Sequence, residues 1–219
     1  MSDFQGLVRG YHQRATGDKY ARLRGWEYLW DHIQSVKTWQ ELASPEHLEK
    51  TALHLGFYLA NWGMFRGSSG LLNVNLDFFK NLTTRLFSEI DTEVWNLWLD
   101  DFAQADSDEV KAFDHALLSI KSFEPSYVSW TETLITKLLL GFWGECPARD
   151  QYFNKGFSSF LNGRGYGRQP STSGRYLVYL NQMRVSEGWS FPTINTKEGN
   201  EYPTGKLIDM AFFQLGAPP

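Results

Sequence analysis

Residues 131–153 read TETLITKLLLGFWGECPARDQYF, and the rest of the chain is organised around this stretch. Apolar residues recur at helical spacing from Leu134 to Phe142 and leave hardly any polar face apart from Thr136 and Lys137. That pattern is typical of a helix buried on nearly all sides. We therefore expect this helix to form the centre of the fold.

The end of this helix and the start of the next can also be predicted. Gly144 is expected to end the buried helix, because glycine readily adopts the left-handed conformation that closes helices. Pro147 then prevents the helix from resuming until a new one begins near Asp150. The Asp150 carboxylate would lie at the positive end of that new helix, with Arg149 beside it. Asp150 is therefore the first candidate for a functional residue.

Helical periodicity marks most of the remaining chain. We predict further helices over residues 20–36, 45–62, 76–86, 94–102, 110–121, 150–160, 176–183 and 203–213, which gives about nine helices with the buried one. No stretch favours a strand, and no internal repeat is found. The predicted fold is all-α and compact. It is either one domain over residues 1–219 or two lobes with a cleft between them, 45–125 and 126–219 plus the N-terminal helix.

Charge is distributed unevenly along a chain whose net charge is -4. Nine acidic residues lie within residues 89–114, where only Lys111 opposes them. Residues 147–184 instead carry basic residues against Asp150 alone: Arg149, Lys155, Arg164, Arg168, Arg175 and Arg184. Residues 147–184 also include the long glycine-rich loop 162–174, and long loops in compact domains are often functional. The second region could therefore attract phosphates, although both regions could equally be ordinary solvated faces.

Several classes of site are disfavoured by what the sequence lacks. Cys146 is the single cysteine, so neither an internal disulfide nor a thiolate metal site can form. The five histidines share no metal-ligand spacing: His12, His32, His47, His54 and His115. No nucleotide-binding loop or serine nucleophile motif is present, and we expect no cofactor and no metal. No signal segment or apolar run of membrane-spanning length occurs, which predicts a soluble, cytoplasmic protein.

Three stretches carry a resemblance to a known group of proteins. FYLANWGMFRGSS at 57–69, TLITKLLLG at 133–141 and PARDQYF at 147–153 resemble the signatures of a bacterial family of uncharacterised, largely helical proteins. That resemblance covers most of the chain and implies no activity.

A second resemblance does imply an activity. The order of elements along the chain is similar to that in helix-hairpin-helix DNA glycosylases. It runs from an apolar helix and a small-residue turn through several helices to a buried helix, a short loop and an aspartate that opens the next helix. In that superfamily the aspartate is catalytic, and Asp150 occupies the matching position. The chain departs from the pattern in two places. The stretch EPSYVSW at 124–130 lacks the hairpin glycines, and the lysine of the bifunctional members would fall near Glu132 rather than Lys137. The resemblance therefore implies a monofunctional enzyme.

The enzyme so implied would hydrolyse the N-glycosidic bond of a flipped, damaged or modified base in double-stranded or single-stranded DNA. Asp150 would stabilise positive charge on the sugar and orient the attacking water. The expected substrate-binding residues are Trp62, Trp143 and Tyr152 as pocket walls and Arg66 and Glu132 as polar edges. The expected phosphate contacts are Arg149, Lys155, Arg164 and Arg168. A phage-modified base as substrate would place the protein in antiviral defence, and a monomer is favoured.

Plainer interpretations of the same residues remain open. Lys137 is either a nucleophile or a lysine whose ammonium reaches the surface. The aromatic helices could form a groove in a non-enzymatic interaction protein, with Asp150 only a helix cap. The turn at Arg66 and an aromatic pocket could instead bind a small molecule.

Overall fold

The computed structural model describes residues 3–218, and over these residues the protein is built from nine α-helices. The helices are α1 (Phe4–Gly17), α2 (Leu23–Gln34), α3 (Leu48–Asn61), α4 (Leu76–Thr84), α5 (Asp108–Lys121), α6 (Glu132–Phe142), α7 (Gln151–Leu161), α8 (Gly174–Ser186) and α9 (Thr204–Gly216). Within the described residues the only β-type pairing is an isolated bridge between Asn195 and Glu201. The predicted all-α fold is confirmed.

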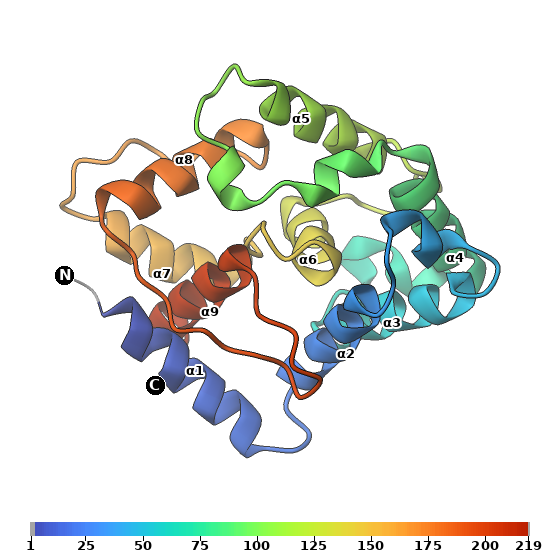
Figure 1. The fold of residues 1–219 in the computed structure, drawn as a ribbon, viewed down its shortest axis with the longest axis horizontal. Coiled ribbons are helices and arrows are strands. Elements are labelled where there is room, and N and C mark those ends of the chain that lie inside the picture. Colours follow the sequence, from blue (N-terminus) through green and yellow to red (C-terminus); the bar gives the residue numbers. More distant parts are fainter. Residues whose placement is uncertain (1–2, 219) are drawn as a thin grey trace.

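Helix α6 occupies the centre of the molecule, and the other helices surround it (Figure 1). Every residue from Leu134 to Phe142 is buried. Each fully buried leucine contributes about 2 kcal/mol to stability, so this helix is a large part of the core. Thr136 and Lys137, the expected remnant of a polar face, are buried as well. They face the loop that follows α6 and not solvent, as their contacts below show.

The connection from α6 to α7 follows the predicted pattern. Gly144 has a φ of 79°, and a Cβ there would overlap with the ring of Pro203. Asp150 is the N-cap residue of α7, and its side chain accepts hydrogen bonds from the first turn. The segment between them is buried. Asp150 is therefore fixed at the end of a rigid connection.

Helix α7 is held in place by a close crossing with α9. A Cβ on Gly156 would overlap with the Phe212 carbonyl oxygen, and one on Gly216 would overlap with the Tyr152 carbonyl oxygen. The two helices therefore approach to backbone contact. The Phe212 ring also packs edge-on against Phe157, with centroids 4.8 Å apart. This crossing fixes the N-terminus of α7, where Asp150 lies.

Two parts of the helix prediction need correction. Helix α1 was not expected, because Gly6 and Gly10 weaken its helical pattern, yet the Asp3 side chain caps it and Val8 packs into the core. The predicted helix over residues 94–102 is wrong. It is replaced by two short 3₁₀ turns, η5 (Thr92–Asn96) and η6 (Leu99–Asp101). The reason is that the Leu99 amide donates to the Glu145 carboxylate, 3.2 Å away, and not to a preceding carbonyl.

None of the helices within residues 3–218 combines the length and apolar character needed to cross a bilayer.

Candidate functional site

A cavity of about 570 Å³ opens beside the N-terminus of α7, and we call it the Asp150 pocket. Its residues come from α1, α2, α6, α7, α9 and the segments that precede α2 and α7 and follow α3. The lining includes Tyr11, Arg22, Trp62, Arg66, Thr133, Lys137, Asp150, Tyr152 and Phe213. Trp62 and Arg66 belong to the predicted lobe 45–125 and the others to the rest of the chain. The division into lobes itself remains an expectation.

The Asp150 carboxylate is held at three points. Its Oδ1 accepts hydrogen bonds from the amides of Tyr152 and Phe153, each at 3.0 Å. Its Oδ2 accepts one from Lys137 Nζ at 2.7 Å. The side chain is 16% exposed, so it reaches the pocket without lying in open solvent. A carboxylate oxygen with one hydrogen bond keeps further acceptor capacity, so Oδ2 can still bind a water molecule.

Lys137 is the partner that brings α6 into the site. Its side chain is only 3% exposed, and its ammonium lies 4.6 Å from the centroid of the Trp62 ring. The hydroxyl of Tyr58 donates to the Lys137 carbonyl at 2.9 Å, which fixes this turn of the helix. The ammonium is thus desolvated between a carboxylate and an aromatic ring. Such surroundings make it a fixed hydrogen-bond donor at the back of the pocket.

A second ion pair lies close to Trp62. Lys206 Nζ is 3.2 Å from Asp209 Oδ2 and 5.3 Å from the Trp62 ring centroid. Burial lowers the pKa of Lys206, and the Asp209 carboxylate opposes that shift. Asp209 Oδ1 also accepts the amide of Ala148 at 3.1 Å, which anchors the loop leading to Asp150. Two ammonium groups, of Lys137 and Lys206, therefore lie close to the Trp62 ring.

Tyr11 is a third polar group in the pocket. Burial raises the pKa of its phenol, and the Asp209 and Asp150 carboxylates raise it further. The hydroxyl therefore stays protonated over the physiological range and can serve as a hydrogen-bond donor.

The pocket brings together several of the residues predicted from the sequence. Asp150, Trp62, Tyr152 and Arg66 all line it, and Lys137 does too. Tyr152 packs edge-on against Phe213 with centroids 5.1 Å apart, which fixes one wall. Arg66 is exposed at the turn after α3 and belongs to the rim.

Trp143 and Glu132, unlike the other three expected substrate-binding residues, do not line the Asp150 pocket. Trp143 is buried with its Nε1 donating to the Leu97 carbonyl at 3.0 Å, and it lines a different cavity. Glu132 accepts the amide of Thr172 at 2.7 Å and lines the broad hollow beside the loop 162–171. Both residues are five or six positions from Lys137, and this spacing turns their side chains away from its face of the helix.

Arg149 is likewise placed inside the protein and not on a phosphate-binding surface. It is 8% exposed, and its Nη1 donates to Glu132 at 2.6 Å and to the Pro170 carbonyl at 2.7 Å. Its guanidinium also lies 4.8 Å from the Tyr176 ring centroid. These contacts hold the end of the loop before α8, so the guanidinium is placed inside the protein and not at the expected phosphate-binding surface.

The other three expected phosphate contacts differ in their surroundings. Arg164 lies over the Phe160 ring of α7 at 4.1 Å and 3.8 Å from Glu187 at the end of α8, so it is engaged between these two helices. Arg168 is exposed beside the broad hollow and away from the Asp150 pocket. Lys155 is exposed one turn after Gln151, which lines the pocket, so it lies next to the rim.

Several pocket residues were not found from the sequence. Tyr11 belongs to the unpredicted helix α1, although Phe4, Val8 and Tyr11 do follow helical spacing. The pair Lys206 and Asp209, which lies close to Trp62 without lining the pocket, was detectable as two charges three residues apart in an otherwise apolar helix. Arg22 lies at the start of α2 and carries no motif that would single it out.

Within residues 3–218, no three His, Cys, Asp or Glu side chains are grouped so that they could hold a metal ion. Comparisons with protein-family models, curated proteins and solved structures gave no match. The bacterial-family and glycosylase resemblances therefore stay expectations drawn from residue patterns.

Proposed function

We propose that this protein hydrolyses the N-glycosidic bond of a base flipped out of DNA, with Asp150 as the catalytic carboxylate. The observation that carries the proposal is a carboxylate held by two amides and an ammonium at an aromatic-lined cavity of about 570 Å³.

The proposed reaction requires a fixed negative charge close to the sugar. Cleavage of an N-glycosidic bond develops positive charge on the sugar, and a preorganised carboxylate near the anomeric carbon stabilises it. Oδ2 of Asp150 is the oxygen with free acceptor capacity, and it would orient the attacking water. Lys137 fixes the carboxylate, and its remaining N–H groups would donate to the departing base or to the sugar.

The walls suit a planar base. Trp62, Tyr152 and Phe213 offer aromatic surface, and stacking on such side chains is worth about 1–3 kcal/mol per base. That is comparable to the few kcal/mol required to extrude a base from the helix. A damaged or modified base is easier to extrude, so it is the expected substrate class. A phage-modified base would make this a defence activity.

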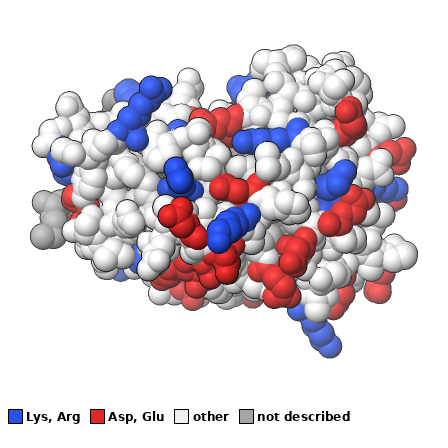
Figure 2. Space-filling view, turned by 90° about the horizontal axis from the view of Figure 1, so that it is seen from above, with Lys and Arg blue, Asp and Glu red and all other residues white. Residues whose placement is uncertain are grey.

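The phosphate contacts that we propose are Arg22, Arg66 and Lys155. Arg22 and Arg66 are exposed and line the pocket, and Lys155 is exposed beside it. DNA would approach from the side of α1, which helps to line the pocket. Helix α5 lies at the opposite end of the molecule (Figure 1). Figure 2 shows the face that carries α5, with acidic side chains gathered toward the lower edge of the view. The acidic side chains gathered there would disfavour a polyanion.

The test is base release from a panel of duplex and single-stranded DNAs carrying normal, damaged and hypermodified bases. We expect alkali-labile abasic sites with at least one modified base. Borohydride should trap no covalent adduct if Lys137 is only a hydrogen-bond donor. Binding without cleavage of any substrate in the panel would count against hydrolysis and favour a non-enzymatic DNA-binding protein.

A further inference from the structure

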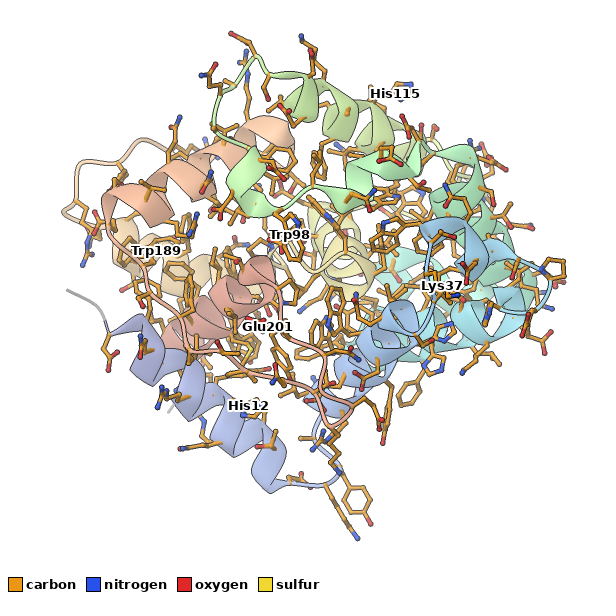
Figure 3. The ribbon with its side chains drawn as sticks, in the orientation of Figure 1. His12, Lys37, Trp98, His115, Trp189 and Glu201 are labelled. Atoms are coloured by element: carbon orange, nitrogen blue, oxygen red, sulfur yellow. The ribbon has the colours of Figure 1, made fainter. Side chains whose placement is uncertain are left out.

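A second cavity, of about 590 Å³, lies between the η5 and η6 turns and the segment before α9, and we call it the indole pocket. Five tryptophans and one tyrosine line it: Trp30, Trp39, Trp95, Trp98, Trp143 and Tyr202. Figure 3 labels Trp98, from the segment before η6, and Glu201, from the segment before α9. The indole pocket shares no lining residue with the Asp150 pocket.

The indole N–H groups of Trp30, Trp39, Trp95 and Trp143 are already used by the protein. Trp30 Nε1 donates to the Glu201 carbonyl at 3.1 Å, Trp39 Nε1 to Asn96 Oδ1 at 2.8 Å, and Trp143 Nε1 to the Leu97 carbonyl at 3.0 Å. Trp95 and Trp143 meet at 60° with centroids 5.9 Å apart. These hydrogen bonds lock the rings, and what the indoles offer a ligand is their π surface.

Glu145 is the one buried charge in this lining. Its side chain lies on the segment between α6 and α7, and the residue is 2% exposed. Its Oε2 accepts the amides of Leu99 at 3.2 Å and Gly205 at 3.4 Å, which caps the first turn of α9. Its Oε1 is buried and has no hydrogen-bond partner within the described residues. Capping of α9 explains why Oε2 is buried, but it gives Oε1 no hydrogen-bond partner.

The charges around this oxygen have one sign. The lining contains Glu145 and Glu201 and no lysine, arginine or histidine. Burial raises the pKa of Glu145 to about 7, and Asp101 adds to that effect. A group that brings positive charge to Oε1 would relieve the unfavourable burial, whereas an anion would be repelled.

We propose that the indole pocket binds a small organic cation, with its positive charge against the indole faces and close to the buried Glu145 carboxylate. Aromatic side chains attract such cations through the negative face of the ring, and the attraction is strongest for tryptophan. A neutral apolar ligand would fill the cavity but leave the Glu145 oxygen without a partner. The ligand is either an aliphatic ammonium or a planar cationic heterocycle, and both share this chemistry.

Isothermal titration calorimetry on the full chain tests this with two matched pairs of probes. Choline is compared with 3,3-dimethylbutan-1-ol, its neutral carbon analogue, and the N-methylnicotinamide cation is compared with nicotinamide. We expect at least one cation to bind 10-fold or more tightly than its neutral partner. The pair that shows the difference identifies the source as aliphatic or planar. Equal binding within every pair that binds, or binding of neither cation, overturns the proposal.

Three variants assign the binding to this cavity. Glu145→Gln keeps an acceptor for the two amides and should weaken cation binding by 10-fold or more. Trp98→Ala removes a ring that is 62% exposed at the rim, so it should weaken binding several-fold without unfolding the protein. Asp150→Asn should leave cation binding unchanged, which separates this proposal from the proposed hydrolysis. Unchanged binding in both Glu145→Gln and Trp98→Ala would place the ligand elsewhere and refute the assignment.

Discussion

Replacing Asp150 with asparagine removes one negative charge from the pocket but keeps a side chain that caps helices well. The stability cost of Asp150→Asn should therefore come from Lys137, whose side chain is 3% exposed and would lose its one carboxylate partner among residues 3–218. Breaking a fully buried ion pair costs about 3–5 kcal/mol. Asp150 is 16% exposed and the ammonium keeps its contact with Trp62, so we expect about 2–3 kcal/mol.

A double-mutant cycle tests this reasoning. Lys137→Met removes the ammonium and keeps the length of the side chain, so the double variant leaves no unpaired charge. We expect the double variant to be less destabilised than the sum of the single variants by about 1.5 kcal/mol or more. The assay is urea unfolding, and Asp150→Asn should also lower Tm by about 4–12 °C.

The matched control is the exposed pair Asp108 and Lys111, which also lies at the start of a helix with its charged atoms 2.8 Å apart. Asp108→Asn and Lys111→Met should show no measurable coupling, because solvent screens exposed pairs. Additive effects of Asp150→Asn and Lys137→Met, within about 0.5 kcal/mol, would refute a buried ion pair at this site.

Three further predictions concern the α7–α9 crossing, the DNA contacts and Glu145. Gly156→Ala should destabilise the protein by about 2 kcal/mol or more in urea unfolding, because its Cβ would overlap with the Phe212 carbonyl. The control Gly10→Ala, in α1 with open space around it, should be neutral or slightly stabilising. If Arg22, Arg66 and Lys155 contact phosphates, log Kd should rise with log salt with a slope of about 2.7 for duplex DNA. Arg22→Ala should reduce that slope by about 0.9, whereas Arg168→Ala should leave it unchanged. The raised pKa of Glu145 means that the folded state binds more protons than the unfolded state between the ordinary value of 4.5 and about 7. Stability should therefore fall as pH rises through that window, by about 3 kcal/mol at most from this group. Glu145→Gln should lose less over the same range, and identical pH profiles of Tm would contradict the shift.

The central helix and the Asp150 cap could be predicted because their signals are local. Apolar periodicity, Gly144, Pro147 and an aspartate at the restart each act within a few residues. The meeting of Lys137 with Asp150 depends on how the loop between α6 and α7 folds back. Periodicity places Lys137 on a buried helix but says nothing of the partner that makes its burial tolerable.

The remaining errors have similar causes. Arg149 and Asp150 are neighbours in sequence, but the guanidinium lies inside against Glu132 while the carboxylate reaches the pocket. Charge counts along the chain cannot distinguish these two directions. The segment 94–102 has apolar residues at helical spacing, but Glu145 captures the Leu99 amide and so replaces a helical hydrogen bond. Such competition from a residue 46 positions away is a tertiary effect.

The most direct measurement is the single-turnover rate of base release by the wild-type protein and by Asp150→Asn on the best substrate of the DNA panel. Circular dichroism and urea unfolding would confirm that both proteins are folded under the assay conditions. We predict that the wild type releases the base and that Asp150→Asn is slower by at least about 100-fold. A rate in Asp150→Asn close to that of the wild type would show that the carboxylate is a helix cap alone.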